Sequence, residues 1–569
     1  MKGLYTSLVI VLLSINVFGQ SPNWEWAKNS SGTNGNLGSS IAVDGNGNSY
    51  VVGSFSCPTI SFGTYTLTNA DTSIGFTDNF IVKYDINGNV QWAHRSGGTY
   101  EDSCTSIVTD VNGNSYISGY FFSSSITFGS TTLINTDISG NTPNIFIVKY
   151  DSNGNVLWAN SPIGGGWVNS IVLDAAGNFY VTGCFRSSTI ILGTTTLVNF
   201  DNTGSTEDLF IAKYDTNGNN IWANSAGGNW NEEGYCISVD DIGNTYITGY
   251  FWSATLTIGA TTLVNAGCCT MADMFVAKYD INGNPLWAKR AGGAIEEYGF
   301  GIAVDGIGNS YVIGRFASPS ITFGSIVLLN SDNSGSTYDI FMTKYDTNGN
   351  VVWSKSAGGN YFHDEGFGIV LDANANIYVT GYFSSPFIMF GTNVLIRSGY
   401  QDIFITEYDN NGNNLWAKSA SGINMDISNH IILDATGNSY ITGFTGSPSM
   451  TFGSTTLTNV GVFVAKLNSS TVEVNKVPKD ETGIYVFPNP FTSETTITFN
   501  EAGSTTQHNI KVMNTLGECI QQLTTSNKQL ILDMSGYAKG VYFVRIESSF
   551  SLPLSDGETK PVYKKLVLQ

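Results

Sequence analysis

The chain has 569 residues, of which 25 are Lys or Arg and 45 are Asp or Glu, giving a formal net charge of −20. Charged residues make up 12% of the sequence and aromatic residues 13%, with 64 glycines, a composition that excludes a disordered chain and argues against a helical one. The acidic balance excludes a nucleic-acid partner, because phosphate binding needs a basic surface. The abundance of Gly, Thr, Asn and aromatic residues favours many short strands joined by tight turns.

The first 19 residues have the pattern of a bacterial export signal. Lys2 gives a positive start, residues 4–18 are mostly apolar, and Val17 and Gly19 stand at positions −3 and −1 of a small-residue cleavage site. The apolar run is too short for a comfortable membrane span, and no later segment has the roughly 18 apolar residues that a span needs. We expect a mature chain that begins at Gln20, has no transmembrane segment and works outside the cytoplasm.

The cysteines follow no pattern that would indicate a disulfide scaffold or a zinc site, since their spacing is irregular and no C-x-x-C pair occurs. The sequence leaves any single bridge unassigned. The seven cysteines are Cys57, Cys104, Cys184, Cys236, Cys268, Cys269 and Cys519.

Residues 20–468 are built of seven repeats. Each repeat holds four apolar runs typical of strands, here named A (I-x-V-D), B (Y-V-x-G-x-F), C (F-x-x-K-Y-D) and D (W-A-K). A hairpin-like segment such as residues 126–135 lies between B and C. Turns of the form D-x-x-G-N join A to B and C to D, because Asp bonds the backbone two residues on and Gly supplies a positive φ. The repeats begin near Trp26, Trp92, Trp158, Trp222, Trp287, Trp353 and Trp416.

A four-stranded antiparallel meander repeated seven times predicts an all-β fold, a seven-bladed β-propeller. The chain opens on a D run, and its last repeat ends on a C run with no W-A-K run after it. We therefore expect residues 26–29 to pair with residues 462–467, so that the two ends complete one blade and close the ring. A β-solenoid, the alternative, would not need this offset. The repeats resemble those of the SBBP family of secreted bacterial proteins over residues 24–469, which implies a propeller and extracellular use but no single activity.

Beyond the repeats, residues 469–482 predict a polar linker and residues 483–569 predict a small β-sandwich. The sandwich resembles the type A C-terminal sorting domain of the type IX secretion system. That resemblance implies a Bacteroidota-type source, the type IX machinery as a partner, and export through the periplasm to the outer cell surface or the medium. An ordinary accessory β-sandwich is the alternative. The residues that carry the resemblance are Pro488, Asn489, Pro490, Gly540, Tyr542, Lys564 and Lys565.

The candidate functional site is the loop that joins strand D of one repeat to strand A of the next. The sequence has only four His and no H-E-x-x-H, G-x-S-x-G or phosphate-binding loop motif. Four of the D–A loops instead carry an acidic pair, and several carry an aromatic residue. In a propeller these loops share one face with the B–C hairpins, so the acids should ring one mouth of the central channel. The candidate ligand-binding residues are Glu101, Asp102, Trp167, Trp230, Glu232, Glu233, Glu296, Glu297, Tyr361, Asp364 and Glu365.

Several functions are compatible with these loops. We favour a monomeric, non-catalytic module that needs no cofactor and binds a glycan or a protein through this face. A ring of carboxylates could also hold calcium through hard oxygen ligands, so metal dependence stays open. A hydrolase or lyase acting on extracellular polysaccharide is the alternative, and it would need two carboxylates at a defined separation. The remaining possibility is a purely structural or adhesive module, whose loop carboxylates are only solvated.

Overall fold

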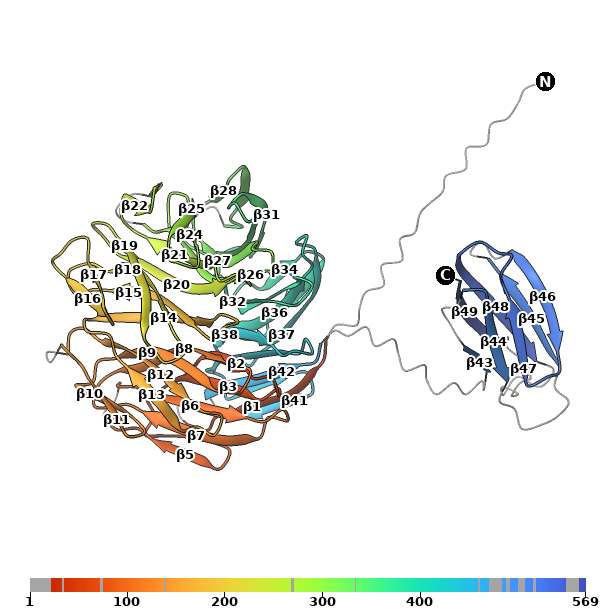
Figure 1. Cartoon of the computed structure of the whole chain (residues 1–569), viewed down its shortest axis with the longest axis horizontal. Coiled ribbons are helices and arrows are strands. Elements are labelled where there is room, and N and C mark those ends of the chain that lie inside the picture. The colour runs from red at the N-terminus through yellow and green to blue at the C-terminus, as the bar shows by residue number, and fades with distance from the viewer. Residues whose placement is uncertain are drawn as a thin grey trace, which may run out of the picture. The chain divides into compact units, whose positions relative to one another are not determined.

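A computed structural model describes residues 22–32, 35–71, 75–137, 140–267, 271–332, 334–458, 461–469, 484–487, 492–499, 507–514, 518–548 and 562–568. The predicted signal peptide, nearly all of the predicted linker, Pro488 to Pro490, Cys268 and Cys269 lie outside these residues. The chain divides into two compact units, residues 1–471 and 472–569. Every regular element in the described ranges is a strand (Figure 1). No helix suited to crossing a membrane is therefore found there.

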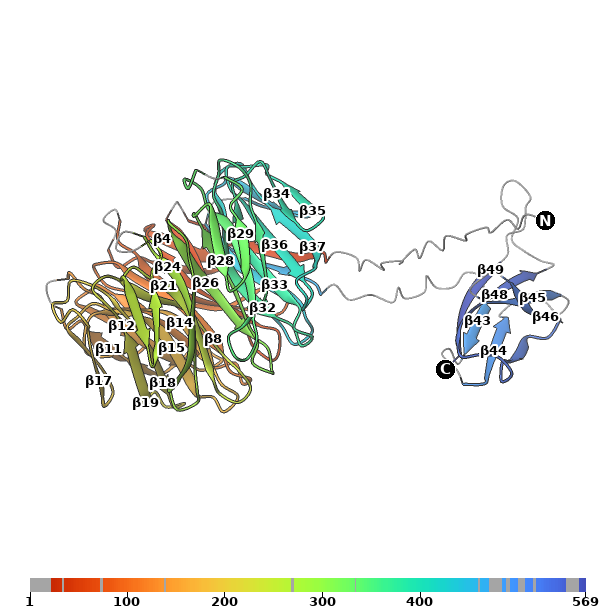
Figure 2. The ribbon, with the colours of Figure 1, turned by 90° about the horizontal axis from the view of Figure 1, so that it is seen from above.

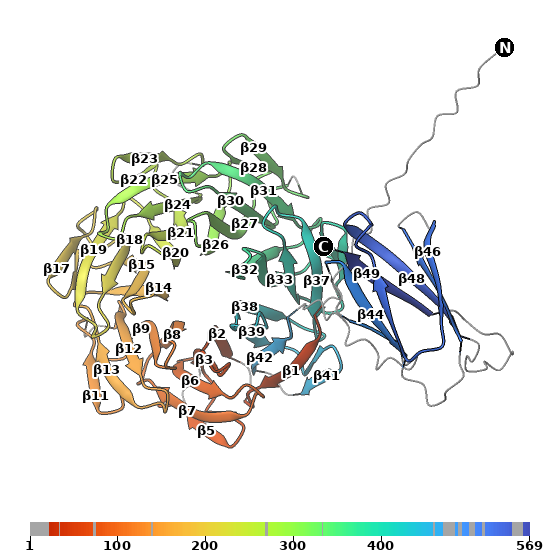
Figure 3. The same ribbon diagram turned by 45° about the vertical axis from the view of Figure 1, so that its right-hand side comes forward.

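The first unit is propeller-like: its described residues form repeated four-stranded antiparallel sheets, seven in number. Six sheets run in chain order through strands A to D, as the repeats predict. The A strands lie innermost (Figure 3). The A strands are β2 (Asn36–Val43), β8 (Asp102–Thr109), β14 (Gly166–Leu173), β20 (Glu232–Val239), β26 (Glu297–Val304), β32 (Asp364–Leu371) and β38 (Asp426–Leu433). The B strands are β3 (Ser49–Phe55), β9 (Ser115–Phe121), β15 (Phe179–Phe185), β21 (Thr245–Phe251), β27 (Ser310–Phe316), β33 (Ile377–Phe383) and β39 (Ser439–Thr445).

The C and D strands complete each sheet on its outer side. The C strands are β6 (Asp78–Tyr84), β12 (Asn144–Tyr150), β18 (Asp208–Tyr214), β24 (Asp273–Tyr279), β30 (Asp339–Tyr345), β36 (Asp402–Tyr408) and β42 (Gly461–Leu467). The D strands are β1 (Trp24–Asn29), β7 (Val90–Ser96), β13 (Val156–Asn160), β19 (Asn220–Ala226), β25 (Pro285–Ala291), β31 (Val351–Ala357) and β37 (Asn414–Ala420).

The predicted segments between B and C form separate two-stranded hairpins. They are β4 (Thr59–Phe62) with β5 (Tyr65–Thr68), β10 (Ser125–Phe128) with β11 (Thr131–Ile134), β16 (Thr189–Leu192) with β17 (Thr195–Val198), β22 (Thr255–Ile258) with β23 (Thr261–Val264), β28 (Ser320–Phe323) with β29 (Ile326–Leu329), β34 (Phe387–Phe390) with β35 (Asn393–Ile396), and β40 (Ser449–Phe452) with β41 (Thr455–Thr458).

The first strand of the chain belongs to the last sheet, as the offset of the W-A-K runs predicts. β1 pairs antiparallel with β42, with Trp26 opposite Lys466 and Asn29 opposite Phe463. β2 in turn contacts β38 and β39, so the first and last sheets of the unit are neighbours (Figure 3).

The D-x-x-G-N turns form as expected. Asp346 Oδ1 accepts hydrogen bonds from the backbone N–H groups of Asn348 and Asn350 at 2.9 and 2.8 Å, and Oδ2 accepts one from Asn350 Nδ2 at 2.9 Å. Gly349 takes a φ of 77°, which glycine adopts without strain. Both carboxylate oxygens are occupied within the turn, so hairpin geometry alone accounts for the repeated motif.

The second unit is a small β-sandwich (Figure 2). One sheet has the order β43-β44-β47 and the other the order β46-β45-β48-β49. Both contribute fully buried side chains, such as Ile497 from one and Val512 and Val544 from the other, to a shared core. Gly540 and Tyr542 lie in β48, and Lys564 and Lys565 in β49. The strands are β43 (Ile484–Phe487), β44 (Glu494–Phe499), β45 (His508–Met513), β46 (Cys519–Thr525), β47 (Gln529–Asp533), β48 (Gly540–Ser548) and β49 (Val562–Leu568).

Candidate functional site

Each A strand contains a β-bulge. In β26 the pairing with β27 shifts between Gly299 and Gly301, which leaves Phe300 as the extra residue. The glycine of the B strand permits this shift, since a Cβ on Gly314 would stand 1.9 Å from the carbonyl oxygen of Tyr298. Only glycine allows so close an approach of two backbones. The equivalent glycines are Gly53, Gly119, Gly183, Gly249, Gly381 and Gly443.

The bulged residues meet at one cavity of about 270 Å³, here called the channel cavity. Three consecutive sheets supply Tyr235, Phe300 and Phe367, whose ring centres are 5.4 Å apart for the first two and 5.2 Å apart for the last two. The other four sheets supply hydroxyl or amide groups. The four polar bulge residues are Ser39, Thr105, Asn169 and Asn429.

The channel cavity is uncharged near neutral pH. Within the described part of the chain, its lining includes no Asp, Glu, Lys or Arg. His430 lines it, and burial lowers the pKa of that imidazole to about 4, so it is neutral at pH 7. One side of the cavity is therefore aromatic and the other carries neutral polar groups, an arrangement typical of small-ligand sites. The amides of Asn169 and Asn429 already donate to the carbonyls of Gly234 and Gly38, so they offer a ligand chiefly their Oδ1 acceptors.

The sequence predicts that the acidic pairs lie in the D–A loops. The structure differs, because one member of each pair is the first residue of an A strand. Its carboxylate is fully buried and joins two turns. Asp364, for example, accepts hydrogen bonds from the backbone N–H of Gly359 in the D–A turn and from those of Ser384 and Ser385 in the B–C turn. The strand extends to this residue because these bonds fix it between the turns. The four buried members are Asp102, Glu232, Glu297 and Asp364.

Burial raises the pKa of these four carboxyls, and the rise is smallest where most donors reach the carboxylate. Asp364, which also accepts from Ser385 Oγ, has a pKa of about 6. Asp102 and Glu297 have pKa values of about 7. Glu232 accepts from the backbone N–H of Ser253 at 3.1 Å, its Oε2 has no partner among the described residues, and its pKa rises to about 8. These four groups bond the turns and are fully buried in the structure.

The second members of the pairs occupy two different registers. Glu101 and Glu296 precede the buried acid, whereas Glu233 and Glu365 follow it within the A strand. Glu101 is exposed and accepts from Tyr120 Oη at 2.9 Å. Glu296 is half-buried and accepts from Tyr338 Oη at 3.4 Å, and Glu365 is 6% exposed. The four pairs are therefore not equivalent sites around one ring.

Arg315, which the sequence reasoning missed, neutralises Glu365. Its Nη1 lies 2.8 Å from Glu365 Oε2, and Tyr382 Oη donates to Oε1 of the same carboxylate at 2.6 Å. The guanidinium carbon lies 4.0 Å from the centre of the Tyr338 ring and 4.8 Å from that of Tyr298, in cation–π contact. The sequence did contain a signal for Arg315: it is the one charged residue at this position of strand B, where the other six repeats have Ser, Tyr, Cys or Phe.

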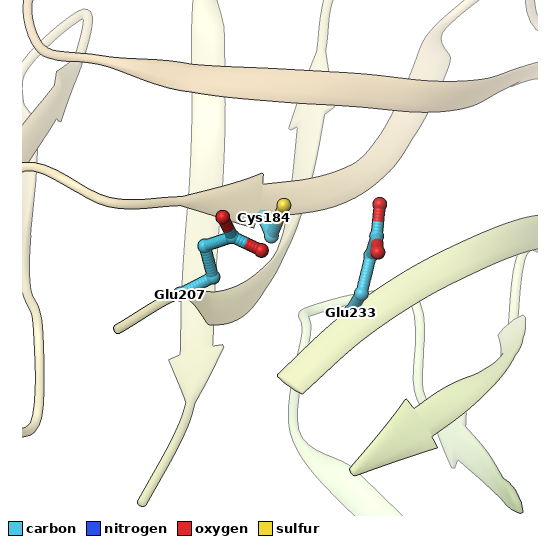
Figure 4. Close-up of side chains that lie close together, drawn as sticks. All are labelled: Cys184, Glu207 and Glu233. Carbon is cyan, nitrogen blue, oxygen red and sulfur yellow. The ribbon is translucent and has the colours of Figure 1, made fainter. Parts of the chain in front are cut away.

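Glu233 of β20 belongs to a second cluster, with Cys184 of β15 and Glu207, which immediately precedes β18 (Figure 4). One donor atom from each lies within 4.8 Å of the others, and Asn169 Nδ2 donates to Glu233 Oε1 at 2.8 Å. Burial, together with the two carboxylates, holds the pKa of the Cys184 thiol well above its usual range. One sulfur and two carboxylates could hold a zinc-like ion; calcium prefers oxygen ligands alone.

The predicted aromatic residues differ in exposure. Tyr361 is 79% exposed and has a φ of 71°, a strained conformation for a residue other than glycine. Trp230 is 45% exposed. Trp167 is half-buried, with its ring centre 6.5 Å from that of Tyr120. The structure thus presents Tyr361 and Trp230 to solvent and packs Trp167 between sheets.

Comparisons with solved structures give matches of low sequence identity. The WD40 domain of Pan2 from Neurospora crassa aligns with 77% of this chain and 89% of that chain, at 10% identity and a TM-score of 0.37. PorZ of Porphyromonas gingivalis, a bacterial surface component of the type-IX secretion system, aligns with 94% of this chain and 81% of that chain, at 12% identity and a TM-score of 0.22.

Among curated proteins, an uncharacterized WD repeat-containing protein, L264 of Acanthamoeba polyphaga mimivirus, is 27% identical over 478 residues, 69% of this chain and 34% of that protein. The regulatory protein FlaEY of Caulobacter vibrioides is 29% identical over 143 residues, 25% of this chain and 14% of that protein. This chain thus spans about a third or less of the relatives it matches. Residues 485–552 match the family model of the secretion system C-terminal sorting domain. The predicted sorting domain is thereby confirmed, and it points to secretion to the cell surface or the outside.

Proposed function

We propose that the chain is a closed seven-bladed SBBP-type β-propeller from a Bacteroidota-like bacterium, carried out of the cell by its C-terminal domain. The parts would be a signal peptide at residues 1–19, the propeller at 20–468, a linker at 469–482 and the sorting domain at 483–569. The pairing of β1 with β42 and the contacts of β2 with β38 support closure. The sorting-domain match at 485–552 supports export by the type IX machinery, with the signal peptide providing entry to the periplasm.

The propeller is, on this proposal, a monomeric and non-catalytic module that binds a neutral glycan in the channel cavity. The observation that carries this conclusion is the split lining, with Tyr235, Phe300 and Phe367 on one side and four neutral polar side chains on the other. A sugar ring has an apolar C–H face that packs on aromatic rings and hydroxyls that bond amides and hydroxyl groups. An uncharged lining suits an uncharged ligand, because a charged one would lose its hydration without a counter-charge.

The residues predicted at the mouth would extend this site. Glu101, Glu296, Glu233, Trp230 and Tyr361 would bond or stack on further sugar units beyond the cavity. Polysaccharide hydrolysis is less well supported. A glycosidase needs two accessible carboxyls flanking the bond, whereas one member of every acidic pair is buried in turns and Glu365 is held in an ion pair.

The test is a glycan-array screen of the mature chain from Gln20, run once with calcium and once with a chelator. We expect neutral glycans to bind equally under both conditions. Phe300→Ala should lose the binding, because it removes the central ring of the aromatic side. Ile307→Ala is the matched control, since Ile307 is 77% exposed in the A–B turn on the opposite face. Binding that requires calcium, or that survives Phe300→Ala, would contradict the proposal; a protein ligand would be sought if no glycan binds.

A further inference from the structure

A second and larger cavity, of about 410 Å³, lies between two neighbouring sheets away from the channel. It is bounded by the end of β13, the tip of the β16–β17 hairpin and the turn between β18 and β19. We call it the Trp158 cavity. Its lining includes Trp158, Asn160, Phe179, Ile191, Tyr214 and Asn219.

Two departures from the repeat pattern accompany this cavity. The other D strands after β1 have seven residues, but β13 ends early, at Asn160. It ends there because Pro162 follows and has no N–H to continue the ladder. Phe179 opens β15 at a place where the other B strands have Ser, Thr or Ile. The Phe179 ring stacks on Tyr214 at 4.9 Å and on Trp158 at 5.8 Å between ring centres.

Two polar groups of this cavity have no hydrogen-bond partner among the described residues. In five other repeats the equivalent indole N–H donates to a backbone carbonyl of the neighbouring C–D turn, as Trp222 does to Ile281 at 3.1 Å. The buried Nε1 of Trp158 makes no such bond. Tyr214 is only 5% exposed, and its Oη is also unpaired. Both side chains line this cavity, and buried polar groups normally find a partner, so a molecule held in the cavity is one way to supply the two missing hydrogen bonds.

We propose that the Trp158 cavity binds one neutral sugar ring, free or at the end of a chain, independently of the channel cavity. No charged side chain is found in its described lining, which disfavours an ionic ligand. Ile147, Ile163 and Ile191 offer apolar contacts for the C–H face of a sugar, and the amide groups of Asn160 and Asn219 lie beside it. Sugar oxygens would accept from Trp158 Nε1 and bond Tyr214 Oη. A flat aromatic ligand fits less well, because Trp158 and Tyr214 already stack on Phe179.

The test is NMR of the mature full chain labelled with ¹⁵N at the tryptophan indoles. The probes are the methyl glycosides of glucose, galactose, mannose and N-acetylglucosamine, with phenol as the flat aromatic comparison. Trp158→Phe identifies the Trp158 indole signal. We expect one or more glycosides to shift this signal downfield, because the N–H gains an acceptor. Tyr214→Phe should weaken that binding roughly fivefold to tenfold, the effect of one hydrogen bond.

Two controls keep the outcome specific. Trp222→Phe should leave the affinity unchanged, because the Trp222 indole already donates to Ile281. Phe300→Ala should also leave the glycoside affinity of the Trp158 cavity unchanged, because the channel cavity is a separate site. Loss of binding at the channel cavity and loss of binding at the Trp158 cavity can therefore be distinguished. No shift of the Trp158 signal with any glycoside at about 50 mM, where millimolar ligands bind, would overturn the proposal. A shift with phenol but with no sugar would overturn the ligand class.

Discussion

Replacing Glu232 by Gln should remove the part of the pH dependence of propeller stability that this single buried carboxyl contributes. Glu232 is fully buried at the start of β20, and only one of its carboxylate oxygens has a hydrogen-bond partner among the described residues. Burial raises its pKa from the ordinary 4.5 to about 8. Gln has nearly the same shape and carries no charge at any pH, so the variant keeps the packing and loses the titration.

The direction and size of the effect follow from proton linkage. Below pH 4.5 the group is protonated in both the folded and the unfolded chain. Between pH 4.5 and about 8 the unfolded chain has released this proton while the folded chain retains it, so the free energy of unfolding falls as pH rises. At about 1.4 kcal/mol for each pKa unit, wild type should lose at most about 5 kcal/mol relative to Glu232→Gln across this window. Asp102, Glu297 and Asp364 titrate in both proteins and cancel in the difference.

The assay is guanidinium unfolding of both mature proteins at intervals from pH 4.5 to 9, followed by tryptophan fluorescence. All 11 tryptophans lie in the first unit, between Trp24 and Trp416, so the signal reports the propeller. Glu101→Gln is the control, because it makes the same chemical change at the neighbouring D–A position of another repeat, where the side chain is exposed. The prediction concerns how the difference in unfolding free energy between wild type and Glu232→Gln changes with pH. If that difference changes by less than about 0.5 kcal/mol between pH 4.5 and 9, a buried, poorly solvated carboxyl at this position is refuted.

Three further predictions test the fold and the export route. Gly314→Ala should lower the free energy of unfolding, measured by thermal unfolding, by more than about 2 kcal/mol, because its Cβ would stand 1.9 Å from the Tyr298 carbonyl oxygen. Gly45→Ala is the control and should change stability little, because its Cβ would meet only Val111 O at 3.5 Å. Removing residues 22–29 uncovers the edge of β42 and should lower the melting midpoint by at least roughly 5 °C and produce oligomers in size-exclusion chromatography; a stable monomer would argue against closure through β1. Deleting residues 485–569 should leave the protein in the periplasm on cell fractionation, and normal export of the truncated chain would contradict the sorting role.

Much of the fold could be predicted because its signals are local. Alternating apolar residues and the D-x-x-G-N turns marked strands and hairpins within each repeat, and the unmatched W-A-K run at Trp26 marked the partner of β42. The strands of the C-terminal sandwich were marked in the same way. β46 (Cys519–Thr525) has a weaker local signal, because its polar Gln521 and Gln522 interrupt the apolar alternation.

The site was predicted less well because it depends on the register between strands. The glycine of Y-V-x-G-x-F was visible in every repeat, yet its consequence, a bulge that places Phe300 at the channel cavity, appears only when strand A is aligned with strand B. The acidic pairs look alike in sequence, but register separates the buried Glu232 from Glu233 beside it. The ion pair of Arg315 with Glu365 joins residues 50 positions apart, beyond the reach of any local pattern.

The most direct test of the central claim is a crystal structure of the mature protein with the glycan that binds best on the array. We expect an intact glycan with one sugar ring in the channel cavity, its C–H face on Phe300 and its hydroxyls bonded to Asn169 or Asn429. A glycan bound elsewhere, with the channel cavity unused, would contradict the assignment of the site. A cleaved glycosidic bond between Glu233 and a second carboxyl would contradict the non-catalytic role.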